Sequence, residues 1–411
     1  MTGRETAAAG TAAALTRQRR SRDVLTRPLL TCFAIASLVH AVTYLLNAVL
    51  PLHVAALGGS KTQIGMLFSV STAVSMVLRP LVGGWNDRYG FRRVVVPGVA
   101  ALLLTSTALH WASTPAAAIA LMVGLGLANG LISTSAGVLV ARATPPAQRG
   151  EALSIYYVAT SLGFAVGPPL GLALYAAGGP RVDFLVAVAL SAVVGALTLS
   201  LTDPVALAIS DVRPGWRVYS RHALPMSGAL VLTNLGNSAV YAFLPLYAMA
   251  SGMKGNVGWF YALFSGGLIA CRLVLRGMSD RVGRFRVVVA AMALIAVSYL
   301  ALALPPSAAS LATAALLLAG GAGLLYPTLV ALLVDRTPEP ERGLAIGTLS
   351  ASFDVGIVVG SLLIGFAVEH TSYALGYALA GGLAAVGLAT FVATERARAR
   401  VVSRPAPGVS S

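Results

Sequence analysis

The chain has 411 residues, of which 57% are hydrophobic and only 10% charged, and its mean hydropathy is +0.81. Soluble domains carry about 25% charged residues, so this composition excludes an ordinary soluble domain and predicts an integral membrane protein. The formal net charge of +15 could also indicate nucleic-acid binding, and the positions of the charges along the chain decide between these interpretations.

The first segment, residues 1–27, is rich in Ala and Arg and is predicted to be a disordered cytoplasmic tail. Its basic stretch is typical of a tail that lies beside anionic lipid, and nucleic-acid binding is the weaker interpretation. The run "RRSRDVL" (19–25) is faintly similar to a twin-arginine export signal. Because a long apolar run follows it and eleven more come after, we expect an uncleaved first helix.

Twelve apolar stretches follow, separated by charged or Pro/Gly-rich breaks. An α-helix needs about 20 apolar residues to cross the roughly 30 Å of bilayer hydrocarbon, and each stretch approaches that length. Since lipid cannot satisfy exposed backbone groups, the predicted fold class is an all-α integral membrane protein with twelve transmembrane helices. The spans are expected at 29–52, 62–82, 93–112, 117–141, 151–176, 182–202, 223–248, 256–276, 286–305, 308–334, 343–368 and 372–393.

The basic residues fall almost entirely on one side of this arrangement. With both termini in the cytoplasm, only Lys61, Arg181 and Lys254 of the 29 Lys and Arg lie on the far side. This is the positive-inside pattern, and it predicts a multi-pass protein of the plasma membrane, most simply a bacterial one, with no nucleic-acid partner. The two cysteines, Cys32 and Cys271, fall inside apolar spans, so neither a disulfide framework nor a metal site is expected.

An internal repeat relates the two halves of the chain at an offset of 193 residues, the separation of Asp87 and Asp280. The same offset places "TPPAQRG" (144–150) on "TPEPERG" (337–343). It also pairs Arg79 with Arg272, Gly90 with Gly283, Gly163 with Gly356 and Gly167 with Gly360. The chain is therefore predicted to be two six-helix units, 28–202 and 223–394, joined by a cytoplasmic linker at 203–222 and followed by a disordered cytoplasmic tail at 395–411. Six is an even number, so the two repeats are parallel.

The loop between the second and third spans, "GGWNDRYGFRR" (83–93), is repeated as "RGMSDRVGRFR" (276–286). With the twelve spans and the duplication, this loop resembles that of the major facilitator superfamily, whose signature is G-x-x-x-D-[RK]-x-G-[RK]-[RK]. The matching residues of the first copy are Gly83, Asp87, Arg88, Gly90 and Arg92, followed by Arg93, with Phe91 in place of a basic residue. The second copy keeps Asp280, Arg281, Gly283 and Arg284 but has Arg276 at the first glycine.

The resemblance implies a gating role for this loop. An acid at the end of the second helix can cap the N-terminus of a neighbouring helix, where the macrodipole favours negative charge. In the family that neighbour is the eleventh helix, which here begins near Arg342 and Gly343, and the partner of Asp280 would begin near Gly150. Such contacts form when the inner face is closed. The alternative is that the loop supplies only topology-fixing charge and a tight turn.

The fifth span contains "GFAVGPPLG" (163–171), in which Gly163, Gly167 and Gly171 share one helix face beside Pro168. The pattern resembles the helix 5 motif of drug:proton antiporters and so implies export. Leu172 replaces the last glycine of that motif, and the fourth span lacks the arginine common in those antiporters. A small-residue face for helix packing is an equally good interpretation.

Asp354 is the acidic residue placed deepest in an apolar span. It lies about eleven residues into the eleventh span, on the order of 16 Å at 1.5 Å per residue. A charge there costs roughly 3 kcal/mol and should face a cavity or a partner. We expect a proton-coupling or substrate role, and the rival is a structural tie from the eleventh helix to the second or fifth.

The resemblance also implies which helices line a central cavity, namely the first, fourth, seventh and tenth. The polar residues on these helices are candidates for its wall: His40, Tyr44, Asn47, Asn129, Asn234, Asn237, Tyr241 and Tyr326. Tyr156 and Tyr157 on the fifth helix are weaker candidates. Only one face of each helix can line a cavity, so some of these residues must lie elsewhere.

No catalytic or nucleotide-binding motif stands out, and "GGSKT" (58–62) lacks the glycine before lysine of a phosphate loop. We therefore expect no enzyme activity, no cofactor and no metal, and an ion gradient as the energy source. The favoured function is a monomeric, proton-coupled exporter of a small organic compound. The alternatives are a proton-coupled importer of a nutrient such as a sugar or organic acid, and a membrane sensor that transports nothing.

Overall fold

The structure is a computed structural model that describes residues 27–145, 148–201, 219–253, 257–275 and 278–402. The described residues are almost entirely helical. The first half comprises α2 (Arg27–Ala56), α3 (Lys61–Tyr89), α4 (Phe91–Ala108) with the short turn η1 (Leu109–Trp111), α5 (Pro115–Ala143), α6 (Arg149–Gly178) and α7 (Pro180–Ser200). The second half comprises α8 (Leu224–Asn234), α9 (Asn237–Ala250), α10 (Gly258–Val274), α11 (Met278–Val282), α12 (Arg284–Leu302), α13 (Ala308–Arg336), η3 (Glu339–Glu341), α14 (Arg342–His370) and α15 (Tyr373–Val402).

The expected membrane spans are confirmed. Within the described part of the chain, eleven helical segments are long and apolar enough to cross a membrane, and α10 is a shorter apolar helix of 17 residues. The seventh span, Leu224–Ala250, is broken into α8 and α9, which the sequence did not predict. At the break, a side chain on Gly236 would come within 2.6 Å of the Tyr299 ring.

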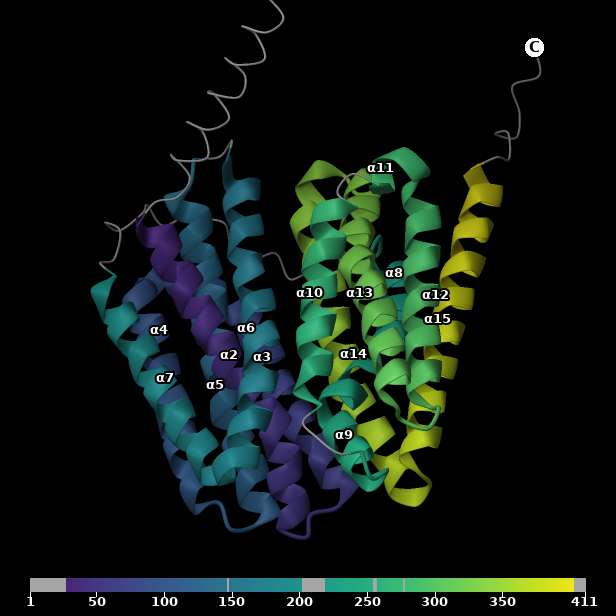
Figure 1. Ribbon diagram of the computed structural model, residues 1–411. Helices are drawn as coiled ribbons and strands as arrows, with labels where there is room; N and C mark the ends of the chain where they lie inside the picture. Colours follow the sequence, from purple (N-terminus) through teal and green to yellow (C-terminus); the bar gives the residue numbers. More distant parts are fainter. Residues whose placement is uncertain (1–26, 146–147, 202–218, 254–256, 276–277, 403–411) are drawn as a thin grey trace, which may run out of the picture.

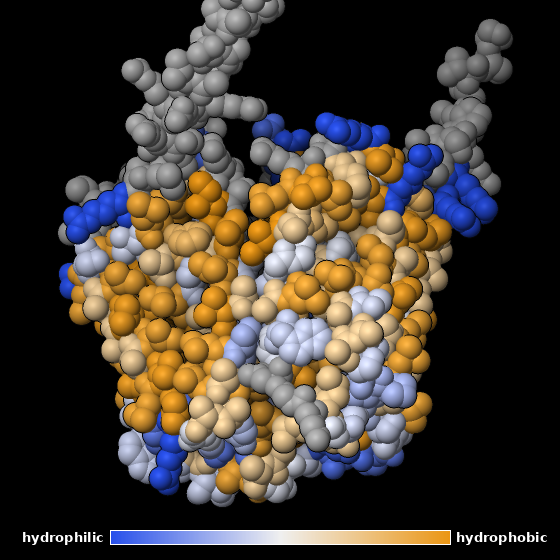
Figure 2. Space-filling model, viewed as in Figure 1, coloured by the Kyte–Doolittle hydropathy of each residue, from blue (hydrophilic) through white to orange (hydrophobic). Residues whose placement is uncertain are grey.

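The two halves stand side by side as two bundles (Figure 1). The first residues of α2 and the last of α15 lie at the same end, which we call the terminal side, and the other end the opposite side. Apolar side chains cover the middle of the visible face, and hydrophilic ones gather at the two ends (Figure 2). This banded surface is the one that a bilayer requires.

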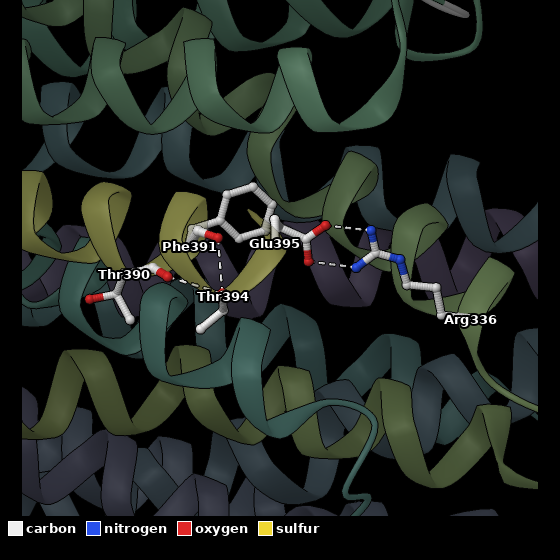
Figure 3. A network of polar contacts seen from close by, with 5 residues as sticks. All are labelled: Arg336, Thr390, Phe391, Thr394 and Glu395. Atoms are coloured by element: carbon white, nitrogen blue, oxygen red, sulfur yellow. Dashed lines mark hydrogen bonds and ion pairs between the residues drawn. The ribbon is translucent and has the colours of Figure 1, made fainter. Parts of the chain in front are cut away.

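The last helix is longer than expected. α15 continues to Val402, so the first residues of the predicted tail at 395–411 are helical. Arg336 on α13 donates two hydrogen bonds to the Glu395 carboxylate, at 2.6 and 2.5 Å (Figure 3). This two-pronged ion pair holds the extension of α15 against the end of α13.

The repeated loop is a tight turn in both halves. Gly90 joins α3 to α4 with φ of 83°, and Gly283 joins α11 to α12 with φ of 98°. Side chains rarely adopt this region of backbone conformation, so the turn requires glycine at both positions. The turn function of these two glycines explains their recurrence in the repeat.

Glycines also allow close helix packing inside each half. A side chain on Gly163 or Gly167 of α6 would come within 2.6 to 2.7 Å of atoms of α2, and Gly171 meets Leu45 at 3.0 Å. In the second half, a side chain on Gly360 of α14 would lie 2.1 Å from the Leu235 carbonyl, beside the break between α8 and α9. The same contact, α6 on α2 and α14 on α8, is thus built twice.

Candidate functional site between the two halves

On the opposite side, α3 and α14 cap each other's ends across the boundary between the halves. The Thr62 backbone N–H donates to the Glu369 carboxylate at 3.0 Å, and the Lys61 ammonium donates to the Val368 carbonyl at 3.3 Å. The ammonium also lies 5.1 Å from the centre of the Tyr373 ring. An acid at a helix N-terminus and a cation at a helix C-terminus are both favoured by the helix dipoles. We call Lys61, Thr62, Glu369 and Tyr373 the opposite-side clasp.

Next to the clasp the two helices touch directly. A side chain on Gly65 would lie 2.2 Å from the Ser361 carbonyl, so only glycine permits this crossing. One turn further along α3, the Ser69 hydroxyl donates to the Val358 carbonyl at 2.8 Å and lies 2.5 Å from the Ser361 hydroxyl. The opposite-side part of this boundary is therefore tightly packed.

Aromatic side chains from both halves meet in the same part of the molecule. Phe164 on α6 is central, with ring centres of Tyr44, Tyr241 and Phe264 at 4.7, 5.2 and 5.2 Å. The aromatic layer consists of Tyr44, Phe68 and Phe164 from the first half and Tyr241, Tyr261 and Phe264 from the second. The small gap between Tyr44, Asn47, Pro168 and Tyr241 leaves no room for a water molecule. The six rings are packed across the boundary between the halves.

Nearer the terminal side, an ion pair joins α3 to α14. The Arg79 guanidinium donates to the Asp354 carboxylate, whose side chain is only 8% exposed, whereas that of Arg79 is 48% exposed. The expected partner of Asp354 was either α3 or α6, and the structure selects α3. Sequence reasoning did not include Arg79 among the site residues, although the internal repeat had already marked it.

The equivalent position of the second boundary carries a second arginine. Arg272 on α10 donates to the Ser161 hydroxyl of α6 at 3.3 Å. Arg272 is the repeat counterpart of Arg79, and Ser161 lies 193 residues before Asp354. In each half, therefore, an arginine contacts the other half, and the two residues contacted, Asp354 and Ser161, are repeat counterparts.

A sequence model described as "Major Facilitator Superfamily" matches residues 32–306 and 254–410 of the chain, which is far more than half of its length. The chain belongs to the major facilitator superfamily. It is accordingly a membrane transporter of the kind that this superfamily comprises.

Curated relatives agree with this assignment, and solved transporter structures share the fold. An uncharacterized MFS-type transporter of Burkholderia mallei (strain SAVP1) is 28% identical over 84% of this chain and 86% of the relative. The uncharacterized MFS-type transporter YhhS of Escherichia coli (strain K12) is 26% identical over 83% and 86%. A crystal structure of a peptide transporter, POT, in complex with sulfate superposes with a TM-score of 0.76 at 15% identity, over 90% and 95% of the two chains. A mutant of the nucleoside transporter NupG superposes with a TM-score of 0.74 at 14% identity, over 89% and 99%.

Several predicted cavity residues of the transporter hydrogen-bond to neighbouring helices or to their own. The Asn129 amide donates to the Thr43 hydroxyl at 3.0 Å, which links α5 to α2. The Tyr326 hydroxyl lies 2.5 Å from that of Ser350, which links α13 to α14. His40 Nδ1 lies 2.7 Å from the Ala36 carbonyl of its own helix.

The other predicted residues divide between the aromatic layer and the helix break. Tyr44, Asn47 and Tyr241 gather at the aromatic layer, and Asn237 lies one helical turn before Tyr241 on α9. Asn234 is buried at the end of α8, where its Cβ lies 2.8 Å from the position that a Gly356 side chain would take. The structure thus brings Tyr44, Asn47, Asn237 and Tyr241 together and leaves Asn129, Asn234 and Tyr326 in helix-to-helix contacts.

The signature loop forms its ion pair inside the first half. Asp87 pairs with Arg142 at the end of α5, and not with the beginning of α14 as expected for the closed inner face. In the second half Arg284 pairs with Asp335 of α13, and the side chain of Asp280 lies outside the described residues. Outside its own stretch of helix, no described atom lies within 4 Å of the position that a Gly83 side chain would take, so no other helix packs closely against this glycine. The described ion pair of Asp87 therefore lies within the first half.

Proposed function

We propose that this transporter is a secondary active carrier that moves a small organic compound by alternating access and exports it in exchange for protons. The observation that carries the proposal is the uneven distribution of contacts between the halves. The described hydrogen bonds and ion pairs that join the two six-helix bundles run from the clasp to the level of Arg79 and Arg272. Nearer the termini, the described ion pairs lie within single halves.

This distribution supports a rocking movement of one half against the other. The opposite-side clasp and the aromatic layer act as the closed gate, and the terminal side is the open entrance of the same state. In the alternative state the clasp separates and Asp87 leaves Arg142 to cap the beginning of α14. Parallel repeats that rock about a site near the midplane are the general geometry for such carriers.

The distribution of charge supports a cytoplasmic terminal side. Among the described Lys and Arg, only Lys61 and Arg181 lie on the opposite side, and Lys254 lies outside the described residues. We infer that the termini are cytoplasmic, that the protein works in the plasma membrane, and that the state described here faces inward.

Proton coupling is assigned to the Arg79–Asp354 pair. A proton on Asp354 removes the negative charge that attracts the Arg79 guanidinium, so it weakens the tie between α3 and α14 and favours their relative movement. The rival interpretation, a purely structural tie, predicts loss of stability and no change in coupling. Export is supported by the similarity of the α6 glycine motif to that of drug:proton antiporters. We propose that a single chain suffices, because both gates lie within it.

The test uses the full chain in proteoliposomes with a trapped pH-sensitive dye. A panel of small organic compounds is added outside, and substrate-dependent proton movement is recorded for wild type, Asp354→Asn and the control Asp335→Asn. Asp335 pairs with Arg284 at the terminal end of α13, so the control removes a paired carboxylate away from the candidate site. We expect Asp354→Asn to abolish proton movement while substrate exchange without a gradient persists, and Asp335→Asn to retain both.

Two results would contradict this assignment. Unchanged proton movement in Asp354→Asn overturns the coupling role of this residue. Accumulation of substrate on the proton-rich side is the result expected for antiport. Accumulation on the proton-poor side, to which the protons flow, would establish symport and overturn export.

A further inference from the structure

The two arginines that cross between the halves occupy equivalent positions and have unlike partners. Arg79 faces a carboxylate, Asp354, and Arg272 faces a hydroxyl, Ser161. The charge of Arg79 is therefore compensated within the protein. No acidic side chain that the structure describes lies within ion-pair distance of Arg272. The pair of arginines and the single acid leave one positive charge uncompensated.

Both arginines lie at one level of the membrane, on the terminal side of the aromatic layer. Phe68 precedes Arg79 on α3 by eleven residues, and Tyr261 precedes Arg272 on α10 by the same number. At 1.5 Å per residue each arginine is about 16 Å along its helix from the layer. In the inward-facing state proposed above, this level is reached from the terminal side and closed off beyond by the aromatic rings.

Arg272 is exposed and lies two residues before the end of α10, so its guanidinium can be reached by a ligand. Arginine inside a bilayer faces the protein interior or a water-filled cavity. A neutral hydroxyl satisfies one of its five N–H donors and none of its charge. The planar fork of Arg272 keeps free donors in the geometry that a carboxylate or phosphate fits with two parallel hydrogen bonds.

We propose that the transported compound carries an anionic group, a carboxylate or phosphate, and that Arg272 binds it at the boundary between α6 and α10. The Ser161 hydroxyl serves as a second polar contact to the same group. The proposal rests on the proposed transport function and adds to it the substrate class and the residue that selects it. The two equivalent arginines then have different functions: Arg79 pairs with Asp354, and Arg272 binds the substrate.

Binding is tested on the full chain purified in detergent, at constant ionic strength, by the shift of its melting temperature. The ligands share one ring and differ in charge: benzoate and phenylphosphate as anions, benzyl alcohol as the neutral compound, and benzylamine as the cation. We expect at least one of the anions to raise the melting temperature of wild type, and the alcohol and amine to leave it unchanged.

Three variants assign the effect to Arg272. Arg272→Gln should weaken anion binding by about tenfold or more, because a charge-assisted hydrogen bond is lost. Arg272→Lys keeps the charge and should retain most of the binding, which also shows that this position tolerates change. Arg286→Gln removes an exposed arginine at the start of α12 and should bind like wild type.

The outcomes separate this inference from the proposed function. Stabilisation by the amine or the alcohol and by neither anion, or equal anion binding in wild type and Arg272→Gln, overturns the anionic substrate class even if transport occurs. Anion binding that depends on Arg272, with no proton movement in proteoliposomes, retains this inference and contradicts the coupling. Loss of anion binding in Arg286→Gln as well reduces the effect to surface charge and also overturns the inference.

Discussion

Gly360 illustrates how little space single residues leave between these helices. A side chain there would lie 2.1 Å from the Leu235 carbonyl, and this neighbour is backbone, which cannot rotate away. Gly347, on the same helix α14, has no described neighbour within 4 Å of the equivalent position. The two glycines therefore differ in function: the first permits a helix contact, and the second only lowers the stability of its helix.

We expect Gly360→Ala to destabilise the folded protein and Gly347→Ala to leave it unchanged or slightly more stable. Overpacking costs about 1–3 kcal/mol, whereas Gly to Ala in an unhindered helix gains roughly 0.5–1 kcal/mol. The measurement is the melting temperature of both variants in the same detergent. Equal shifts in the two variants would mean that α14 does not approach the break between α8 and α9 as closely as described.

At the scale of the elements, α3 and α14 are joined at two levels along their length. On the opposite side each helix end caps the other through Lys61 and Glu369. Near the middle the same helices are joined by Arg79 and Asp354. Both contacts lie across the boundary between the halves, so the rocking proposed above must rearrange them. Their strength therefore sets how the two states are populated.

We expect Glu369→Gln to open the opposite side more often, because the Thr62 N–H loses its carboxylate partner. A cap of this kind is worth about 1 kcal/mol, so the open population should rise about fivefold. The measurement is the labelling rate of Asn47→Cys by a membrane-impermeant maleimide, in a background with Cys32 and Cys271 replaced by Ser. Arg181→Gln, which removes an exposed charge at the same end, is the control and should label at the starting rate. Equal labelling rates in Glu369→Gln and Arg181→Gln would show that the clasp does not control opening of the opposite side.

At the scale of the whole molecule, the inward-facing state proposed above has its two bundles in contact on the opposite side and apart on the terminal side. Rigid rocking requires that the two sides respond in opposite directions. Arg93 and Arg286, which are repeat counterparts, mark the terminal side, and Arg181 and Leu304 mark the opposite side.

We expect spin labels at residues 93 and 286 to show a shorter distance when a transported compound and a proton gradient are supplied. Labels at residues 181 and 304 should then show a longer distance, because closing one side opens the other. Pulsed electron–electron double resonance on the reconstituted protein measures both distances. Distances that shorten together would indicate compaction of the whole molecule and contradict rocking.

Much of this architecture could be predicted from the sequence, because the signals that define it are local. Spans follow from runs of apolar residues, and the doubling follows from recurrences such as Asp87 and Asp280. The partner of Asp354 was harder to predict, since packing between the halves brings Arg79 to it over 275 positions of sequence. The break at Gly236 and the clasp at Glu369 also depend on neighbours from distant helices. The repeat did carry a usable signal for Arg79 and Arg272, because a charged residue kept at the same place in both apolar spans requires a partner there.

The ion pairs of the two signature loops have reversed polarity. In the first half the acid, Asp87, is on the loop side and the base, Arg142, ends α5; in the second the base, Arg284, follows the loop and the acid, Asp335, is near the end of α13. Arg142 and Asp335 are counterparts in the repeat, and so are Phe91 and Arg284. Transplanting segment 83–93 onto 276–286 would put a phenylalanine where Asp335 needs a guanidinium. The two loop sequences are similar but cannot be exchanged, because each forms its ion pair with the neighbouring helix of its own half.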